Sequence, residues 1–246
     1  MTLFSGFGLG TVLMPAFALF FPLPVAIAAT AIVHLANNLF KLSLVGRAAN
    51  WWVVLRFGVP AAVAAFAGAA TLVAFAGLDE FVEYELLGRQ FMVTALKLTI
   101  GLLIVAFAAL ELSPRFASLA IPLRYLPIGG VLSGFFGGLS GNQGAFRSAF
   151  LIKAGFDKTA FVATGVVLAV LVDFVRLTVY GGSYFTTQVA TLPAEVLGLV
   201  IAATLTAFLG AFIGLRILEK VTLLAVQRLV ALCLVAIGSG LAARWL

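Results

Sequence analysis

Long apolar runs, separated by short stretches rich in charged and turn-forming residues, constrain the fold of this chain more than any motif does. Dividing the sequence at those stretches leaves eight apolar segments, at about 2–20, 24–45, 52–76, 92–110, 128–152, 159–180, 195–215 and 222–243. Most of them reach the ~20 residues that cross ~30 Å of hydrocarbon at ~1.5 Å per residue. The chain is therefore predicted to fold inside a lipid bilayer.

The composition supports the same class of fold. Of 246 residues, 63% are hydrophobic and 10% are charged, which is outside the range of ordinary soluble domains. Backbone groups in lipid must be paired within the chain, and the alternating pattern of a transmembrane β-barrel is absent, so the segments are predicted to be helices. We expect an all-α polytopic membrane protein that crosses the inner (plasma) membrane several times.

Several classes of function are excluded by the same sequence. No connection between the segments exceeds about 20 residues, so the membrane part must carry the function and an enzyme is not expected. The lone Cys233 permits no intrachain disulfide, and the lone His34 has no second metal ligand at a recognised spacing. We expect no cofactor, no metal site and no catalytic residue. The formal charge of +6 is attributed to loop bases that set topology, not to nucleic-acid binding.

The distribution of charge between the loops sets the expected orientation. The loop after the second segment carries Arg47 and Arg56, whereas the loop after the third carries four acids against Arg89. By the positive-inside bias, the first of these loops is cytoplasmic and the second is external. The basic connection at 111–126 then returns to the cytoplasmic side.

The fifth segment, 128–152, decides the topology of the second half. If it crosses the membrane fully, the basic loop that follows the seventh segment lies outside, against the charge bias. If the chain instead turns back at "SGNQG", the nearby bases are all cytoplasmic. These bases are Lys153, Lys158, Arg216 and Lys220. The charges favour a re-entrant hairpin, and a kinked full span stays as the alternative.

An internal repeat indicates two related halves. A shift of 134 residues superposes Thr30 on Thr164, and both halves share a Ser-Gly-rich break, a short apolar arm and a helix with Ala-Thr in its second turn. We expect eight segments in two pseudo-symmetric four-segment repeats, the first segment of each being broken or re-entrant. The repeats cover 1–110 and 127–246, joined by the cytoplasmic connection 111–126, in one integral membrane domain.

The polar side chains of the second segment fall on one side of the predicted helix. They occupy an arc about 100° wide, and because polar groups facing hydrocarbon are expensive, the arc must face protein or a water-filled cavity. The residues are Thr30, His34, Asn37, Asn38 and Lys41. We favour substrate lining for the two asparagines. Interhelical hydrogen bonding by His34 and snorkelling of Lys41 to the cytoplasmic interface are the alternatives to roles in transport.

The break in the fifth segment carries the sharpest candidate. Arg147 follows "SGNQGAF" within an apolar segment, and a guanidinium at this depth needs an anion, a carboxylate or backbone carbonyls. A helix beginning at Gly144 would add its positive end, and Asn142 and Gln143 would add amide donors. These residues form a candidate cradle for a small oxyanion, unless Arg147 pairs with Asp173 or reaches the lipid headgroups.

Further candidates come from the repeat. In the matching helix of the second half, Asp173 and Arg176 are spaced to form an ion pair at i, i+3; a structural pair and a role in coupling both stay open, and Lys41 is a further coupling candidate. The first break, "FSGFGLG", is a weaker counterpart of the second. Repeat matching adds three residues to the substrate-lining candidates, namely Gly8, Gly10 and Thr164.

These stretches resemble a known family. "SGFGLGTVLMPAFALFFPLPVAIAATAIVHLANN" and "LSGFFGGLSGNQGAFRSAFLIKAGFDKTAFVATGVV" are similar to the two repeats of the sulfite exporter TauE/SafE family, also called the toluene-sulfonate uptake permease family. The shared pattern is a Gly-rich break, an apolar stretch often containing Pro, and a helix opening with Ala and a Thr or Ser. The chain departs from it at "GNQGAFR", where the family more often has successive glycines, and in its short N-terminal arm.

The resemblance implies a membrane permease for small anions such as sulfite, sulfonates or related organic acids. We therefore predict a secondary transporter that works by alternating access around two broken segments. Its partners would be the small anionic substrate and the lipid bilayer, without nucleic acid, and a homo-oligomer stays open. The alternative is a non-transporting assembly or sensor module that packs partners through its Gly-rich faces.

Overall fold

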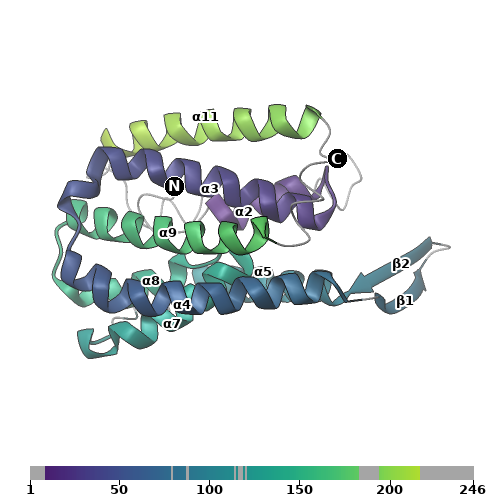
Figure 1. Ribbon diagram of the computed structural model, residues 1–246, viewed down its shortest axis with the longest axis horizontal. Helices are drawn as coiled ribbons and strands as arrows, with labels where there is room; N and C mark the ends of the chain where they lie inside the picture. Colours follow the sequence, from purple (N-terminus) through teal and green to yellow (C-terminus); the bar gives the residue numbers. More distant parts are fainter. Residues whose placement is uncertain are drawn as a thin grey trace.

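The fold is a bundle of apolar helices with one β-hairpin at its end (Figure 1). The structure is a computed structural model, and it describes residues 9–78, 80–86, 89–113, 115, 119, 121–182 and 194–216. Within these residues, four helices are long and apolar enough to cross a membrane. The predicted first break at Gly8 and the eighth segment, 222–243, lie outside the described residues.

The first half begins with α2 and continues through two long helices. Its elements are α2 (Leu9–Ala18), α3 (Leu23–Val45), the short 3-10 helix η1 (Gly46–Ala48) and α4 (Trp51–Ala76). α3 has a proline in its first turn, where the missing N–H costs nothing. α4 begins where the side chain of Asn50 accepts a hydrogen bond from the Val53 amide at 3.2 Å, a regular N-cap. Local sequence thus fixes both helix starts.

An antiparallel β-hairpin, β1 (Glu80–Leu86) and β2 (Arg89–Thr94), follows α4 and leads into α5 (Ala95–Leu112). The charge pattern of this stretch predicts only an acidic loop, so the strands are a difference from the sequence-based expectation. Phe, Val and Tyr residues favour extended structure, and they alternate with acids in "FVEYEL", which explains the strands. The acids Glu83 and Glu85 are exposed on β1.

The second half contains the predicted break. Its elements are η2 (Leu123–Tyr125), α7 (Leu126–Ser140), α8 (Gly144–Leu151), η3 (Ile152–Ala154), α9 (Lys158–Gly181) and α11 (Ala194–Arg216). α7 ends at Gly141, which has a left-handed backbone (φ 81°) that glycine adopts without strain. α8 begins at Gly144, as the sequence predicted. The apolar run 128–152 is therefore two helices joined by a tight turn.

α7 packs against α4 with almost no space between the two backbones. Cβ atoms at Gly130, Gly134 and Gly138 would overlap the carbonyls of Phe57, Ala61 and Ala65, in that order. Because the residue numbers rise together, the two helices run in the same direction. Small residues at a four-residue spacing permit this close approach inside a membrane. The four-residue glycine spacing seen in the sequence therefore serves the packing of two helices of the same chain.

α8 turns back along α7, so the two helices form a hairpin. The ring of Phe150, at the end of α8, fills the space beside Gly129, at the start of α7. Next to it, the Ile121 amide donates to the Ala149 carbonyl at 3.1 Å. Near the turn, the rings of Phe136 and Phe146 stack with centroids 5.4 Å apart. Both ends of the hairpin therefore lie at the end of the bundle where α4 begins.

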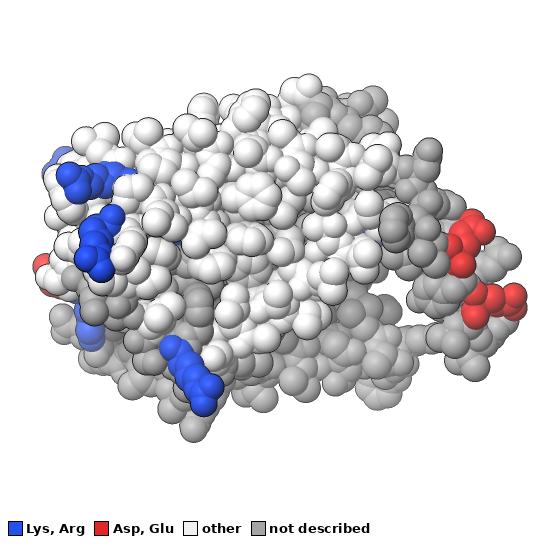
Figure 2. Space-filling model, turned by 90° about the horizontal axis from the view of Figure 1, so that it is seen from below, with Lys and Arg blue, Asp and Glu red and all other residues white. Residues whose placement is uncertain are grey.

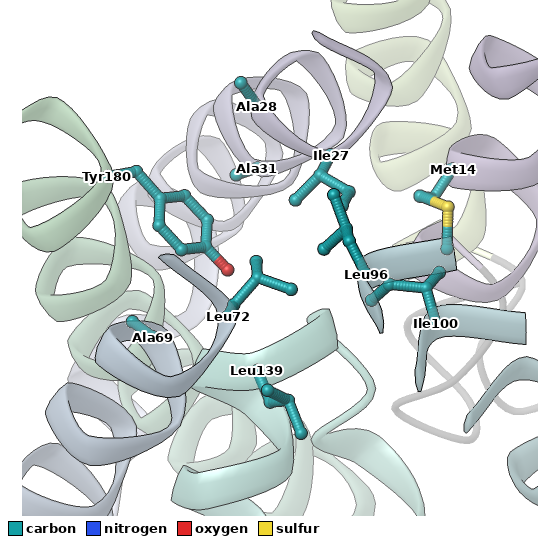
Figure 3. Packing of buried hydrophobic residues seen from close by; sticks show 10 residues of the cluster. All are labelled: Met14, Ile27, Ala28, Ala31, Ala69, Leu72, Leu96, Ile100, Leu139 and Tyr180. Carbon is teal, nitrogen blue, oxygen red and sulfur yellow. The ribbon is translucent and has the colours of Figure 1, made fainter. Parts of the chain in front are cut away.

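α3 and α9, the two long helices that carry most of the buried polar side chains, run antiparallel. Near one end, Val162 of α9 packs with Val45 of α3. Near the other end, Tyr180 of α9 packs in a cluster with Ile27 and Ala31 of α3 (Figure 3). This cluster also joins α2, α4, α5 and α7. Its members are Met14, Ile27, Ala28, Ala31, Ala69, Leu72, Leu96, Ile100, Leu139 and Tyr180.

Charge is segregated between the two ends of the molecule. Figure 2 shows Lys and Arg gathered at one end and the acids of the β-hairpin at the other, with a single acid among the bases. The exposed bases of the first end, called the basic end below, include Arg47, Arg56, Arg124, Lys158 and Arg216, whereas Lys97, at the start of α5, is an exposed base next to the β-hairpin. The opposite end, which carries the β-hairpin, is called the acidic end. This separation agrees with the orientation predicted from the loops.

The contact between α4 and α7 gives a first prediction. In Gly134→Ala, the new methyl group meets the Ala61 backbone, which cannot rotate away as a side chain could. Overpacking of this kind should lower stability by about 1–3 kcal/mol. The midpoint of thermal unfolding in detergent should fall clearly below that of the wild type.

The matched control is Gly101→Ala in α5, where an added Cβ meets no described atom within 4 Å. It should leave the midpoint unchanged or raise it, because alanine favours a helix more than glycine does. Equal shifts in the two variants would contradict the proposed packing.

Candidate functional site

The polar arc of α3 faces protein, as predicted. Thr30, His34, Asn37, Asn38 and Lys41 are all buried, because α9 and α11 pack against this part of the helix. Lys41 has only 2% of its surface exposed, so the idea that it snorkels to the membrane interface is wrong. Its ammonium donates instead to Asn38 Oδ1 at 3.2 Å.

Asp173 of α9 is the centre of a buried hydrogen-bonded network. Its Oδ2 lies 2.6 Å from Nδ1 of His34 and accepts from Nδ2 of Asn38 at 2.9 Å. Its Oδ1 accepts from Nε2 of Gln143, in the break, at 3.3 Å. A carboxylate only accepts, so we assign the proton of neutral His34 to Nδ1. The predicted interhelical bonding of His34 is confirmed, and its partner belongs to the other half of the chain.

Arg176 forms the predicted i, i+3 ion pair with Asp173. Its Nη2 lies 3.1 Å from Asp173 Oδ1, and both residues are almost completely buried. The guanidinium lies directly beside Gly141, and a Cβ there would overlap Nη1. The glycine of the turn therefore makes room for the cation.

Arg147 of α8 is also buried, with 7% of its surface exposed. Its Nη1 donates to Oε1 of Gln143 at 3.3 Å, and this is its one hydrogen bond to the residues that the structure describes. The suggested ion pair with Asp173 is not formed, because Arg176 is the cation paired with that carboxylate and His34 binds its other oxygen. Gln143 lies between Arg147 and Asp173, binding one through each end of its amide.

Asn37 and Lys41 extend the network toward the basic end. With the Asn37 amide oriented to satisfy both of its ends, its oxygen accepts from Lys41 Nζ at 3.0 Å and its nitrogen donates to the Ala207 carbonyl at 3.1 Å. Asn37 thus joins Lys41 of α3 to the backbone of α11.

The remaining candidates are less closely connected to Asp173. Asn142 is buried and donates to Ser140 Oγ at 3.3 Å. Thr164 accepts from the Asn50 amide at 3.0 Å, so its hydroxyl joins the start of α4 to α9 and lies outside the network. Gly10 is in α2 and Gly8 lies outside the described residues.

Two supporting residues were missed by the sequence analysis. Ser133 of α7 donates to the Gln143 carbonyl at 2.9 Å, and the Tyr180 hydroxyl donates to the Gly138 carbonyl at 2.6 Å. Both fix the hairpin turn from the side. Ser133 is ten positions from its partner and Tyr180 forty-two, and no local sequence pattern indicates such pairing.

The charge of the site is unbalanced among the described residues. Its buried cations are Lys41, Arg147 and Arg176, and its buried carboxylate is Asp173 alone. The part of the sequence after Arg216 contains one acid, Glu219. Burying unlike numbers of charges is expensive in a membrane protein unless a functional ligand supplies the difference.

The family profile described as sulfite exporter TauE/SafE matches residues 1–241. The chain belongs to this family of membrane transporters. No curated protein and no solved structure shows significant similarity to it. The family match confirms the resemblance drawn from the two breaks, and it agrees with the long apolar helices.

A hollow of about 370 Å³ in this TauE/SafE protein lies apart from the network, near the basic end. It is lined by Leu44, Val45, Thr159, Val162, Phe212, Leu215 and Arg216. Apolar side chains dominate this lining, and Arg216 lies over the Phe212 ring at 4.3 Å. Few polar groups converge there, so the hollow is a poorer candidate for a small anion than the network.

The network gives a second prediction. Asp173→Asn keeps the shape of the side chain but removes the carboxylate that Arg176 and His34 contact. Breaking a buried ion pair by removing one partner costs about 3–5 kcal/mol. The thermal unfolding midpoint of the variant in detergent should therefore fall well below that of the wild type.

Glu83→Gln makes the same chemical change on an exposed side chain of β1. It should leave the unfolding midpoint almost unchanged, since exposed charges contribute little to stability. If Asp173→Asn were as mild as this control, Asp173 would not be the centre of the network.

Proposed function

We propose that the protein is a secondary transporter of small anions, with sulfite, sulfonates and related organic acids as its substrates. We propose further that the anion binds beside Arg147. The observation that carries this proposal is the environment of Arg147, whose buried guanidinium has a neutral amide as its hydrogen-bond partner. A guanidinium cannot lose its proton in a protein. A buried one with spare donors is a site for an oxyanion, which accepts two parallel hydrogen bonds from it.

The surrounding groups suit the same ligand. α8 begins at Gly144, so its first amides and its positive end lie at the break with Asn142 and Gln143. Gly165 of α9 leaves the space beside Arg147 Nε open, since an added Cβ there would lie 3.5 Å from that nitrogen. Asn37, Asn38, His34 and Thr164, with Gly8 and Gly10, complete the proposed lining of this site, and Thr30 lines the substrate path beyond Asp173.

Asp173, Arg176 and Lys41 are assigned to coupling. Asp173 belongs to the second half of the chain, and His34 and Asn38, which bind it, belong to the first. Any movement of α3 against α9 must break these bonds, and an anion that competes for the donors would favour that change. Binding of the anion to the site would therefore change the relative position of the two halves of the chain. Alternating access requires such a dependence.

The proposed architecture is eight segments in two repeats, with each first segment re-entrant. The α7–α8 hairpin supports this for the second repeat, because both of its ends lie at the basic end and its turn lies beside Asp173. The non-transporting alternative is less favoured. It needs Gly-rich faces that are open to partners, whereas Gly130, Gly134 and Gly138 are occupied by α4.

The transport proposal is tested by flux of radiolabelled sulfite, sulfoacetate and taurine into proteoliposomes. Arg147→Gln should lower anion flux at least tenfold, because losing a charged hydrogen bond of about 1.5–3 kcal/mol costs this much or more. Arg147→Lys should retain part of the flux, since it keeps the charge but loses the planar fork.

Arg124→Gln is the matched control, because Arg124 is exposed at the basic end. It should transport like the wild type.

Competition between ligands tests whether charge is recognised. Methanesulfonate should inhibit flux, and its neutral analogue dimethyl sulfone should not. Absence of flux with every anion would overturn the proposed function.

The hairpin topology is tested by single cysteines in a Cys233→Ser background. Arg124→Cys and Lys158→Cys, placed before and after the hairpin, should react with an impermeant thiol reagent from the same side of the membrane. Glu83→Cys, on β1, should react from the other side. Labelling of positions 124 and 158 from opposite sides would show that the segment crosses the membrane fully.

A further inference from the structure

Three buried polar atoms among the described residues have no hydrogen-bond partner: Thr30 Oγ1 and the Nε and Nη2 atoms of Arg176. Thr30 is 3% exposed and Arg176 is 1% exposed. Buried polar groups are almost always satisfied, and a guanidinium left without acceptors is costly. An acceptor that binds in operation would account for all three atoms at once.

Thr30 and Arg176 lie within about one helical turn of each other along two facing helices. α3 and α9 are antiparallel, with Asp173 opposite His34 and Asn38, and Tyr180 packed with Ile27 and Ala31. Arg176 is between Asp173 and Tyr180 on α9. Thr30 is between His34 and Ile27 on α3. Both side chains therefore belong to the acidic-end side of the carboxylate.

The position of Arg176 explains why its donors are not used by Asp173. The carboxylate already accepts hydrogen bonds from His34, Asn38 and Gln143. Nη2 is 3.1 Å from Oδ1, but this contact lacks hydrogen-bond geometry. The ion pair therefore balances charge while leaving N–H groups of Arg176 directed elsewhere.

Arg147 lies on the opposite side of Asp173. It is close to Gly165, which precedes Arg176 by eleven residues on α9, or about 16 Å along the helix axis. α8 runs from the break back toward the basic end, so Arg147 approaches the network from that end. One guanidinium thus stands on each side of the carboxylate, with the Gly141–Gln143 turn between them.

We propose that Arg176 and Thr30 form a second oxyanion subsite on the acidic-end side of Asp173. The anion occupies it either before it reaches the Arg147 site or after it leaves that site, depending on the direction of transport. This rests on the proposed transport function and adds a defined second position to it. The Thr30 hydroxyl donates to the oxyanion, and Nε and Nη2 of Arg176 supply the charged bonds. The nearby Asp173 repels an anion placed there, so this subsite holds it weakly and suits entry or release.

Thr30→Val tests the subsite, because valine has the shape of threonine without its hydroxyl. The hydroxyl has no hydrogen-bond partner among the described residues, so a Thr30 that only packs between helices predicts no loss of stability and no effect on transport. The subsite predicts an unchanged or raised unfolding midpoint together with a KM for sulfite that rises about tenfold on the acidic-end face. Right-side-out and inside-out membrane vesicles allow the two faces to be measured separately.

Two further variants complete the design. Thr30→Ser keeps the hydroxyl and should retain the wild-type KM at both faces, even if Thr30→Val folds poorly. Thr206→Val is the matched control, since the Thr206 hydroxyl is exposed and bonds its own helix backbone at 2.9 Å. It should transport like the wild type.

The outcomes separate this proposal from the transport function itself. A raised KM for Thr30→Val at the acidic-end face alone supports the subsite. Wild-type KM values at both faces overturn it and leave a buried water as the partner of these atoms. Equal changes at both faces also overturn it, because Thr30 would then serve the Arg147 site. Absence of flux in the wild type would instead overturn the transport function.

Discussion

The rest of the site depends on one ionised carboxylate held inside an apolar bundle. Asp173 accepts from the other half of the chain through His34 and Asn38, and from the hairpin turn through Gln143. The free-energy cost of removing this carboxylate from water is offset only while these donors stay in place. Three segments that are distant in sequence are therefore positioned by one acceptor, and two guanidinium groups are arranged around it.

The second constraint is backbone contact rather than charge. The turn at Gly141 can stand next to Arg176 only because α7 is held tightly along α4 by residues without side chains. Ser133 and Tyr180 then fix the turn by hydrogen bonds to main-chain carbonyls. Rigid backbone around a polar centre is what a preorganised binding site requires, since the donors do not need to rearrange when the ligand arrives.

Much of this could be predicted from sequence, because a bilayer leaves few options. Apolar length predicted the long helices, and the clustered glycines predicted the break and the start of α8. The polar arc of α3 followed from helical periodicity. The contact between His34 and Asp173 could not be predicted, since 139 residues separate them. The burial of Lys41 and the β-hairpin were missed for a similar reason: packing partners and strand pairing override the local pattern.

The glycine contact between α4 and α7 also bears on how this chain can evolve. In most helix pairs, a larger side chain on one partner can be accommodated by a smaller one on the other. Here the atoms opposite Gly130, Gly134 and Gly138 are main-chain carbonyls, which no substitution can shrink. These three positions therefore have no neighbour able to compensate for a change, and they should remain fixed in related sequences while the lipid-facing side of α7 varies freely.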